Sequence, residues 1–486
     1  MIKTHTLLTF FITITAFSQS VISEFPIDIK HKVQTNKKTN EKLISLSTSQ
    51  YLDQFGSKIY TLNEDENILL IQTFDKISIY LLDKKFNSSK VGIIEKQSQN
   101  NFPFHVIKEQ DKIILYFKES KERLFSKSTK ITQIEYNIST KKHKTSSVKF
   151  KPKNERILAC FFLNKEFIIL TNTSSSNILN IYKYSETSID KIEEHNLNEL
   201  EYKTSLDKFD VYASEFLKNS GASIPVINKD SNEPFDKTSL KVKIYKNQNH
   251  LFTLTIDDNK SPNKGTHIYQ FDLDNISKKQ YKYLEYEKSS KKLDYNSLIS
   301  NNKLLQLGIN SNEMKLSIIN LISYNRKTYD FTENDSLFKD NNTHYAMTNI
   351  FTGKQKESNE KSIDNFLKHT SKGSTALSSI ILNKQHHLLI GSKRAITRSS
   401  AVGGMAMSFS YSVTSYFDNY TYILLNRNGE IIPSLDLKKS KIGHIQYFSE
   451  KNTNLKLSCY FNIQDKYYTG YYDAINMLYK IGELCN

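Results

Sequence analysis

The stretch that decides the fold is Ile68-Leu69-Leu70-Ile71-Gln72-Thr73-Phe74, followed by Asp75-Lys76 and then Ile77-Ser78-Ile79-Tyr80-Leu81-Leu82. The first run is short, apolar and rich in residues that favour strands, and the second alternates in part between apolar and polar positions. Two polar residues between two such runs are typical of a tight β-hairpin. The stretch therefore predicts two antiparallel strands joined by a short turn.

The same pattern returns along the chain. Further copies are Ile113 to Phe117 with Ile131 to Tyr136, Phe167 to Leu170 with Ile178 to Tyr184, Leu251 to Ile256 with His267 to Leu273, Leu304 to Leu307 with Leu316 to Leu321, and Tyr422 to Leu425 with an Asn428-Gly429 turn before Ile431-Ile432. At the second strand, Tyr80, Tyr136, Tyr182, Tyr269 and Ile319 are separated by 56, 46, 87 and 50 residues. The long interval is close to twice the others, which predicts a degenerate or interrupted unit between residues 190 and 245.

A period of about 40–50 residues with several strands in each unit is typical of β-propeller blades. Blades cover each other's apolar faces, so the core is distributed along the chain. This suits a chain of 486 residues with a hydrophobic share of 38%, because single cores stop growing at roughly 250–300 residues. We therefore expect an all-β, β-propeller-like array of roughly six to eight small antiparallel sheets, placed over residues 61–486. Tandem β-sandwiches are the alternative.

Two segments depart from the strand pattern. Leu206 to Leu217 places apolar residues at helical spacing, and so does Glu357 to His369, with Ile363, Phe366 and Leu367 on one side. These segments predict short helices within insertions near residues 190–245 and 340–375.

The net charge is +16, from 67 Lys and Arg against 51 Asp and Glu. Binding to nucleic acid would require these cations to gather on one face. The denser runs, such as Lys141-Lys142-His143-Lys144 and Lys438-Lys439-Ser440-Lys441, instead stand between apolar stretches, as solvated turns do. We therefore predict no nucleic-acid partner.

Residues 1–18 have the form of a signal peptide. Lys3 gives a basic start, Leu7 to Phe17 is an uncharged apolar run, and the small residues Ala16 and Ser18 favour cleavage before Gln19. The run is shorter than the roughly 20 apolar residues that span a bilayer, and no later segment approaches that length. We expect a polar N-terminal lead over residues 19–60 and an exported protein, periplasmic or extracellular, without a transmembrane segment after signal removal. A buried N-terminal strand is the alternative.

The junction Ala16-Phe17-Ser18-Gln19 resembles export signals common in Bacteroidetes, and the body, rich in Lys, Asn and Ile, is similar to secreted proteins of flavobacteria. The segment Ser415 to Ile431 resembles one in uncharacterised secreted flavobacterial β-repeat proteins, where a Tyr-rich strand leads into an apolar strand, an Asn-Gly or Asp-Gly turn and another strand. This chain departs from that pattern at Pro433, near the place where a Trp usually follows the turn. The resemblance implies a secreted, propeller-like repeat protein and brings no activity with it.

Several short motifs contain residue types that can bind metal or act in catalysis. Asp257 to Gly265 carries oxygen side chains at alternate positions, but Pro262 replaces the glycine that a calcium loop needs, so we interpret it as a polar hairpin turn. The spacing of Ser289 and Lys292 is interpreted as chance. His386 and His387 would point to opposite faces of a strand, so they could not easily share a metal. Asn63 to Asn67 is interpreted as a solvated loop. The catalytic residues are therefore unknown, and we predict no cofactor and no metal.

Two further features leave alternatives open. Cys459 and Cys485 lie close enough in sequence to form a disulfide, and buried free thiols are the alternative. The stretch Ser399 to Tyr411 is small, uncharged and contains paired glycines, so it predicts either a tightly packed inner strand or a flexible loop that faces a ligand.

The leading hypothesis is an exported, non-catalytic β-repeat protein that binds a protein or glycan partner at the cell envelope. The 29 Tyr and 28 Phe suit that role, because flat aromatic surfaces bind with little loss of entropy. The alternative is a secreted hydrolase whose carboxylate pair is assembled from distant blades.

Overall fold

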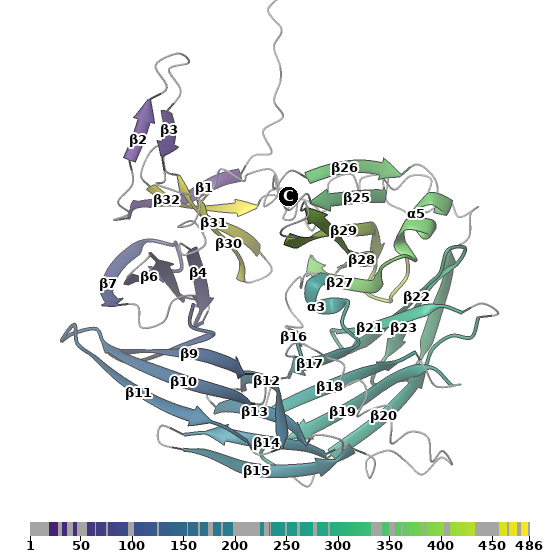
Figure 1. Cartoon of the computed structure of the whole chain (residues 1–486), viewed down its shortest axis with the longest axis horizontal. Helices are drawn as coiled ribbons and strands as arrows, with labels where there is room; N and C mark the ends of the chain where they lie inside the picture. The colour runs from purple at the N-terminus through teal and green to yellow at the C-terminus, as the bar shows by residue number, and fades with distance from the viewer. Residues whose placement is uncertain are drawn as a thin grey trace, which may run out of the picture. The chain divides into compact units, whose positions relative to one another are not determined.

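The computed structural model describes residues 19–27, 32–35 and 42–45 and, apart from short turn segments, residues 56–95, 102–197, 224–331, 343–348, 355–402, 409–432 and 456–484. Over these residues the chain is all-β and propeller-like, as predicted, with seven sheets of four or five strands and one two-stranded sheet (Figure 1). The chain divides into two compact units, the first from residues 1–102, 138–141 and 451–486 and the second from residues 103–137 and 142–450.

Four sheets share one plan, in which four antiparallel strands lie side by side in chain order. They are β4 (Gly56–Thr61), β5 (Glu66–Gln72), β6 (Lys76–Asp83) and β7 (Ser88–Glu95); β8 (His105–Glu109), β9 (Lys112–Arg123), β10 (Ser126–Asn137) and β11 (His143–Phe150); β12 (Glu155–Leu163), β13 (Glu166–Thr173), β14 (Ile178–Tyr184) and β15 (Ile189–Asn196); and β21 (Asp294–Ser300), β22 (Lys303–Ile309), β23 (Met314–Asn320) and β24 (Arg326–Phe331). A fifth sheet has the same plan in β17 (Val242–Lys246), β18 (Leu251–Asp258), β19 (Gly265–Asp272) and β20 (Lys279–Glu285), and adds the short parallel strand β16 (Val226–Ile227).

The predicted hairpins are the second and third strands of these sheets. Leu70 pairs with Ile79, and Phe167 pairs with Tyr184, as the sequence pattern requires. The five landmark residues from Tyr80 to Ile319 all lie on third strands, namely β6, β10, β14, β19 and β23. The second strands are buried along almost their whole length, whereas the fourth strands are largely exposed. The apolar runs in the sequence are therefore strands covered on both faces by neighbouring sheets.

The long interval in the repeat is an insertion, in so far as the structure describes it. Within residues 190–245, β16 belongs to the sheet of β17–β20, and the short helix α3 (Phe235–Thr238) contacts β27 (Ser374–Leu382) and β28 (Gln385–Val402); among the described residues neither forms a unit of its own. The helix predicted over Leu206 to Leu217 lies outside the described residues.

The second predicted helix is confirmed in part. Helix α5 (Ile363–Thr370) buries Ile363, Phe366 and Leu367, as expected. The predicted start at Glu357 is wrong, because strand β26 (Gln355–Glu360) occupies that position and pairs with β25 (Thr343–Thr348).

In the first unit, one sheet is built from strands at both ends of the chain. Strand β1 (Gln19–Pro26) pairs antiparallel with β32 (Leu478–Leu484), next to β31 (Lys466–Asp473) and β30 (Lys456–Ile463). Residues 19–60, the expected polar N-terminal lead, therefore contain β1. They also contain the two-stranded sheet of β2 (Lys32–Thr35) and β3 (Lys42–Ser45). Phe25 of β1 is buried, with its ring centroid 5.8 Å from that of Tyr80 and 5.7 Å from that of Tyr479.

The last sheet departs from chain order. It runs β26, β25, β29 (Phe409–Leu425), β28 (Gln385–Val402) and β27 (Ser374–Leu382). The predicted turn at Asn428-Gly429 is present, with Gly429 at φ 80°, but Ile431 forms only an isolated bridge to Leu425. The Ile432 N–H also donates to the Leu424 carbonyl at 2.8 Å, so the predicted hairpin is confirmed next to its turn. The main partners of β29 are nevertheless β28 and β25.

In the second unit, each sheet packs on the next one along the chain. One apolar cluster joins the sheets of β8–β11 and β12–β15, a second joins β12–β15 to β16–β20, and a third joins β16–β20, β21–β24 and the β27–β28–β29 part of the last sheet. The core is therefore divided among the sheets, which is how the moderate hydrophobic content suffices.

Candidate functional site

The sheet of β16–β20 has two very different faces. Val242, Ile244, Phe252, Leu254 and Ile256 lie in the apolar cluster shared with the sheet of β12–β15. Because side chains alternate along a strand, the residues between them face the sheet of β21–β24, and several of those are polar and fully or nearly fully buried, namely Lys243, Thr253, Thr255 and Asp257. Buried polar side chains require hydrogen-bond partners, so this second face identifies a candidate site.

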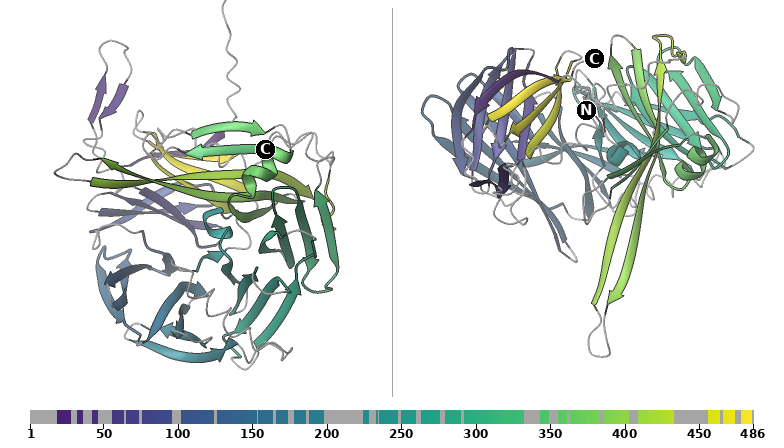
Figure 2. Two further views of the ribbon diagram at one scale, coloured as in Figure 1. Left: turned by 45° about the vertical axis from the view of Figure 1, so that its right-hand side comes forward. Right: turned by 90° about the horizontal axis from the view of Figure 1, so that it is seen from above.

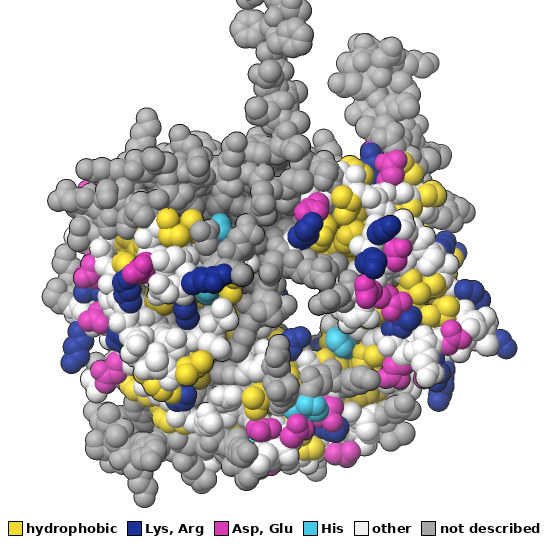
Figure 3. All heavy atoms as spheres, turned by 180° about the vertical axis from the view of Figure 1, so that it is seen from behind, with side chains coloured by type: hydrophobic (Ala, Val, Ile, Leu, Met, Phe, Trp, Pro, Cys, Tyr) yellow, Lys and Arg dark blue, Asp and Glu magenta, His cyan; other side chains and the backbone are white. Residues whose placement is uncertain are grey.

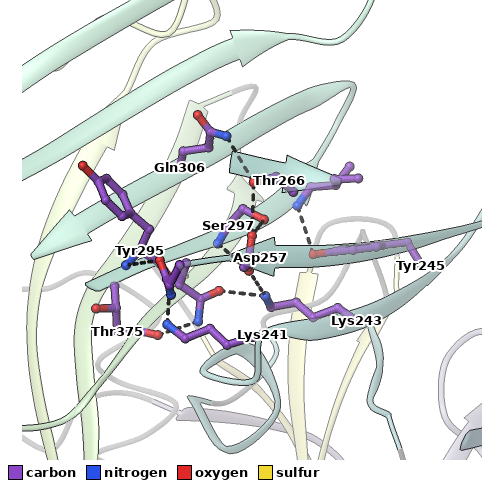
Figure 4. A network of polar contacts seen from close by, with 12 residues as sticks. Lys241, Lys243, Tyr245, Asp257, Thr266, Tyr295, Ser297, Gln306 and Thr375 are labelled. Carbon is purple, nitrogen blue, oxygen red and sulfur yellow. Dashed lines mark hydrogen bonds and ion pairs between the residues drawn. The ribbon is translucent and has the colours of Figure 1, made fainter. Parts of the chain in front are cut away.

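Asp257 is the centre of the site (Figure 4). Its Oδ1 accepts hydrogen bonds from Ser297 Oγ at 2.6 Å, Tyr286 Oη at 2.7 Å and Thr266 Oγ1 at 3.1 Å. Its Oδ2 accepts from Lys243 Nζ at 2.9 Å and from the Ser297 backbone N–H at 3.0 Å. Five donors therefore saturate one carboxylate that is 0% exposed.

Lys243 is the cation of the site, and its side chain is also 0% exposed. Besides Asp257, its Nζ donates to Asn296 Oδ1 at 2.7 Å. The Asn296 Nδ2 in turn donates to the Thr375 backbone carbonyl at 2.5 Å. Since Lys243 belongs to β17, Asn296 to β21 and Thr375 to β27, these contacts join strands of three successive sheets.

A second ion pair lies beside the first, closer to solvent. Lys241 Nζ lies 2.9 Å from Asp294 Oδ1 and donates to the Tyr295 carbonyl at 2.6 Å. Asn259 bonds both the N–H and the carbonyl of Tyr295, and the Asp294 Oδ2 accepts from the Thr375 N–H. Asn259, the residue that follows β18, is thus fixed to β21 by hydrogen bonds.

The ionisation of the site follows from its contacts. Burial alone would raise the pKa of Asp257, but the Lys243 charge and the hydrogen bonds from Ser297, Lys243 and Tyr286 outweigh burial and hold that pKa below its usual value. Burial lowers the pKa of Lys243, against the attraction of Asp257. Burial and the Asp257 charge raise the pKa of Tyr286 well above its usual value, so its phenol keeps the proton that it donates.

This arrangement is suited to holding sheets together and poorly suited to catalysis. A general base needs a pKa near the working pH, whereas the pKa of Asp257 is lowered, and Ser297 donates to that weak base. Lys243, Asp257 and Ser297 are each 0% exposed, so a substrate has no access to them. The network is therefore a set of polar contacts between sheets.

The sequence pattern predicts Asp257 and Asp258 in a polar hairpin turn, and that interpretation is wrong for both residues. The hairpin itself is present, but Asp257 and Asp258 are the last two residues of β18 and are both fully buried. Lys243 provides the charge that a buried carboxylate needs, and it stands 14 residues earlier in the chain. A lysine between apolar residues in Val242-Lys243-Ile244-Tyr245 was the available signal.

The other motifs weighed for chemistry lie apart from this network. Ser289 Oγ donates to Glu313 Oε2 at 2.8 Å. Glu66 and Asn67 begin strand β5, where Asn67 is fully buried, so that half of the acidic cluster is not a solvated loop. Cys459 is a free thiol with its Sγ 3.3 Å from Tyr479 Oη, and Cys485 lies outside the described residues. In the described ranges, no group of three or more His, Cys, Asp or Glu residues could hold a metal ion.

His386 and His387 lie on β28, and His386 is buried. Burial, and then the charges of Lys303 and His387, lower the pKa of His386 to about 4. The folded protein therefore keeps His386 neutral, while the unfolded chain takes up a proton near its ordinary pKa of about 6.5. Because of His386, we expect the free energy of unfolding to fall by about 2–3 kcal/mol when the pH is lowered from 7 to 4.5. The loss begins as the pH falls below about 6.5.

The measurement is urea unfolding followed by circular dichroism at several pH values, since the chain has no Trp. His386→Leu should flatten the dependence on pH relative to wild type. The same experiment on His143→Gln, at an exposed position of β11, serves as the control. An unchanged slope in His386→Leu would contradict the assignment.

A second candidate site is the long hairpin of β28 and β29. These strands pair without a register shift from His386 opposite Leu425 to Val402 opposite Phe409. Strand β27 covers the outer edge of β28 only as far as Lys393, and β25 covers β29 only from Tyr416. We call Arg394–Val402 with Phe409–Phe417 the ribbon; Figure 2 shows it running out beyond the rest of its sheet.

The ribbon contains most of the unusual stretch Ser399 to Tyr411. Residues 395–402 and 409–415 belong to two extended, paired strands, and residues 403–408 lie outside the described part. Residues 399–402 and 409–411 thus lie in a strand pair whose outer edges have no partner strand in the described part of the chain, and the expectation for residues 403–408 stays a prediction.

Charges on the described surface are mixed. On the face in Figure 3, Lys and Arg side chains are interspersed with Asp and Glu, so that face shows no broad patch of one sign. Among the described residues, none of the helices is both long enough and apolar enough to cross a membrane.

No protein-family model and no curated protein matches the chain. Similar solved structures include an uncharacterised protein of Listeria monocytogenes, with 14% identity, TM-score 0.28 and coverage of 70% of this chain and 79% of that one. The WD40 domain of SCAP from fission yeast shows 9% identity, TM-score 0.30 and coverage of 89% and 82%. Prolyl oligopeptidase B of Galerina marginata shows 8% identity, TM-score 0.36 and coverage of 87% of this chain but 47% of that one. At such TM-scores these likenesses carry no argument about activity or partner.

Proposed function

We propose that this chain is an exported, non-catalytic β-repeat protein that binds a protein partner at the cell envelope through the β28–β29 ribbon. The observation that carries the proposal is the pair of open strand edges. Beyond Lys393 and before Tyr416, the backbone of the ribbon has no partner strand on its outer edges among the described residues.

Open edges favour a protein over a glycan as the partner. An exposed strand presents a row of N–H and C=O groups that match those of another strand, and many peptide-binding proteins use this mode. A glycan has no such row of alternating groups. Nine paired residues in each strand give a ribbon about 30 Å long, at roughly 3.3 Å per residue.

Export is supported by the N-terminal sequence, and the expected cleavage is compatible with the described strand β1. The apolar run Leu7 to Phe17 ends just before the expected cleavage point. Gln19 is the first residue of β1, and it lies opposite Leu484. Cleavage before Gln19 would therefore leave every described residue of that sheet in place.

The buried network gives no support to the hydrolase alternative. Its two carboxylates, Asp257 and Asp294, are each bound to a lysine, and Asp257 is inaccessible. A glycosidase of the usual kind needs one carboxyl group that keeps its proton and faces the substrate, whereas the pKa of Asp257 is lowered.

The proposal is tested with a chain whose hairpin is shortened. Ala395 and Tyr416 lie directly opposite each other, so residues 396–415 can be replaced by Asn-Gly, a dipeptide that suits a two-residue hairpin turn. The pairs made by β27 and β25 remain intact in this variant. The full chain, bound to a resin, should capture an envelope protein, which crosslinking then fixes in place. The shortened chain should capture at least about tenfold less, which corresponds to about 1.4 kcal/mol of binding free energy.

Circular dichroism and urea unfolding of both chains provide the control for folding. Equal capture by the two chains would contradict a role of the ribbon in binding. Export is checked on the protein produced in cells, which should be recovered outside the cytoplasm with Gln19 as its first residue; a chain that keeps Met1 and stays in the cytoplasm would contradict export.

A further inference from the structure

We infer that the outer edge of β29 over Phe409–Ser415 pairs antiparallel with the same edge of a second copy of this chain. The two ribbons would then form one continuous four-stranded sheet. This inference rests on the proposed function, in which the ribbon is a protein-binding arm, and it names a partner for that arm.

The edge lacks the features that keep strand edges from pairing. Proteins usually protect an exposed edge with charged residues, proline or a β-bulge. The register of β28 with β29 has no shift, so no bulge interrupts the ribbon. The 19 residues from Ser399 to Phe417 contain no Asp, Glu, Lys, Arg, His or Pro, in a chain of which 24% is charged.

The distribution of charge favours a second copy as the partner. With a net charge of +16, two copies repel each other over most possible contacts. The stretch Ser399–Phe417 is where two copies can approach without placing like charges together. The same lack of charge gives a strongly acidic or basic partner nothing to pair with.

Strand number and symmetry point the same way. A hairpin of two strands is only marginally stable by itself, and three or more strands are needed for independent stability. Beyond Lys393 and Tyr416, each ribbon has two described strands, and pairing two ribbons gives four. An edge that meets itself antiparallel across a two-fold axis is self-complementary and closes as a dimer.

β29 is a better edge for this pairing than β28. Over the ribbon, β28 carries Arg394 and Arg398, which would bring like charges into a contact between copies. From Phe409 to Val413, apolar or aromatic residues alternate with Ser410 and Ser412 in the sequence, a pattern typical of strands in sheets.

The test is the mass of the purified full chain in solution, measured by light scattering after size exclusion over a wide range of protein concentration. We expect the wild type to reach twice the mass of one chain. The shortened chain, with Asn-Gly in place of residues 396–415, should remain a monomer. Ser412→Lys with Val413→Lys should weaken the dimer by more than about tenfold, because like charges would face each other across the new sheet.

Ser412→Thr with Val413→Ile is the matched control and should keep the dimer, since both residues favour strands. A wild type that stays monomeric at every concentration would overturn the inference, and so would a shortened chain that still dimerises. A monomeric wild type that sediments with anionic phosphatidylserine vesicles through the ribbon would overturn it in favour of a lipid surface. Loss of the dimer with retained capture of an envelope protein would leave the proposed function standing, so the two failures are distinguishable.

Discussion

Asp257→Ala is expected to lower the free energy of unfolding of the second unit by about 3–5 kcal/mol. The substitution removes the partner of Lys243, whose ammonium group is 0% exposed, and leaves one hydrogen bond to Asn296 Oδ1. It also removes the acceptor for Ser297, Thr266 and Tyr286, three buried donors. An unpaired buried charge costs more than the ion pair itself contributes.

A double-mutant cycle separates the pair from its surroundings. Lys243→Met combined with Asp257→Leu removes both charges, and we expect the double variant to be more stable than Asp257→Leu alone, because no charge is left unpaired. Lys327→Ala is the control, since its ion pair with Glu430 is about half exposed on both sides and exposed ion pairs contribute little to stability. The measurement is urea unfolding followed by circular dichroism, and a loss below about 1 kcal/mol for Asp257→Ala would show that the network does not hold the sheets together.

Gly391→Ala is expected to destabilise the hairpin of β28 and β29 by about 3 kcal/mol or more. A Cβ atom at Gly391 would lie 1.8 Å from the backbone oxygen of Asn419 and 2.8 Å from the Tyr420 Cα. Gly391 lies opposite Tyr420, so these contacts are on the paired strand itself. Backbone cannot rotate away as a flexible side chain can, and the two strands would have to separate.

The neighbouring residue gives a matched control. Ser392 is also fully buried, and its hydroxyl has no hydrogen-bond partner among the described residues. Ser392→Ala therefore removes an unsatisfied group without adding an atom, and its effect should stay within about 0.5 kcal/mol. Thermal unfolding of the two variants tests the contrast; if Gly391→Ala melted like Ser392→Ala, the close approach of β28 and β29 would be contradicted.

The sequence predicts those strands that neighbouring sheets cover on both faces. Ile68 to Gln72 of β5 and Phe167 to Thr171 of β13 are continuous apolar or strand-favouring runs for that reason, so they stand out in the sequence. Strands such as β11 (His143–Phe150) face solvent over most of their length and read as polar turns. The strand order in the sheet of β25–β29 could not be predicted either. Strand β29 pairs with β28 on one side and with β25 on the other, and β25 is separated from β29 in the chain by three other strands.

The burial of Asp257 was not predictable from the residues next to it in the sequence. Asp257-Asp258-Asn259 has the composition of a turn, and nothing next to it in the chain indicates burial. The partners of Asp257 are Lys243, 14 residues earlier in the chain, and Ser297, 40 residues later. Only the packing of two sheets brings these residues together. The ribbon differs from the network here, because the absence of charge from Ser399 to Phe417 is visible in the sequence alone.

Pairing between β1 and β32 also sets the order of events during synthesis. Gln19 and Leu484 are 465 residues apart, and closing a flexible loop of that length costs about 5 kcal/mol in chain entropy, at (3/2)RT ln n. Strand β1 leaves the ribosome long before β32, the strand with which it pairs. A growing chain therefore carries an incomplete sheet until β32 has been made, and contacts of such long range fold slowly.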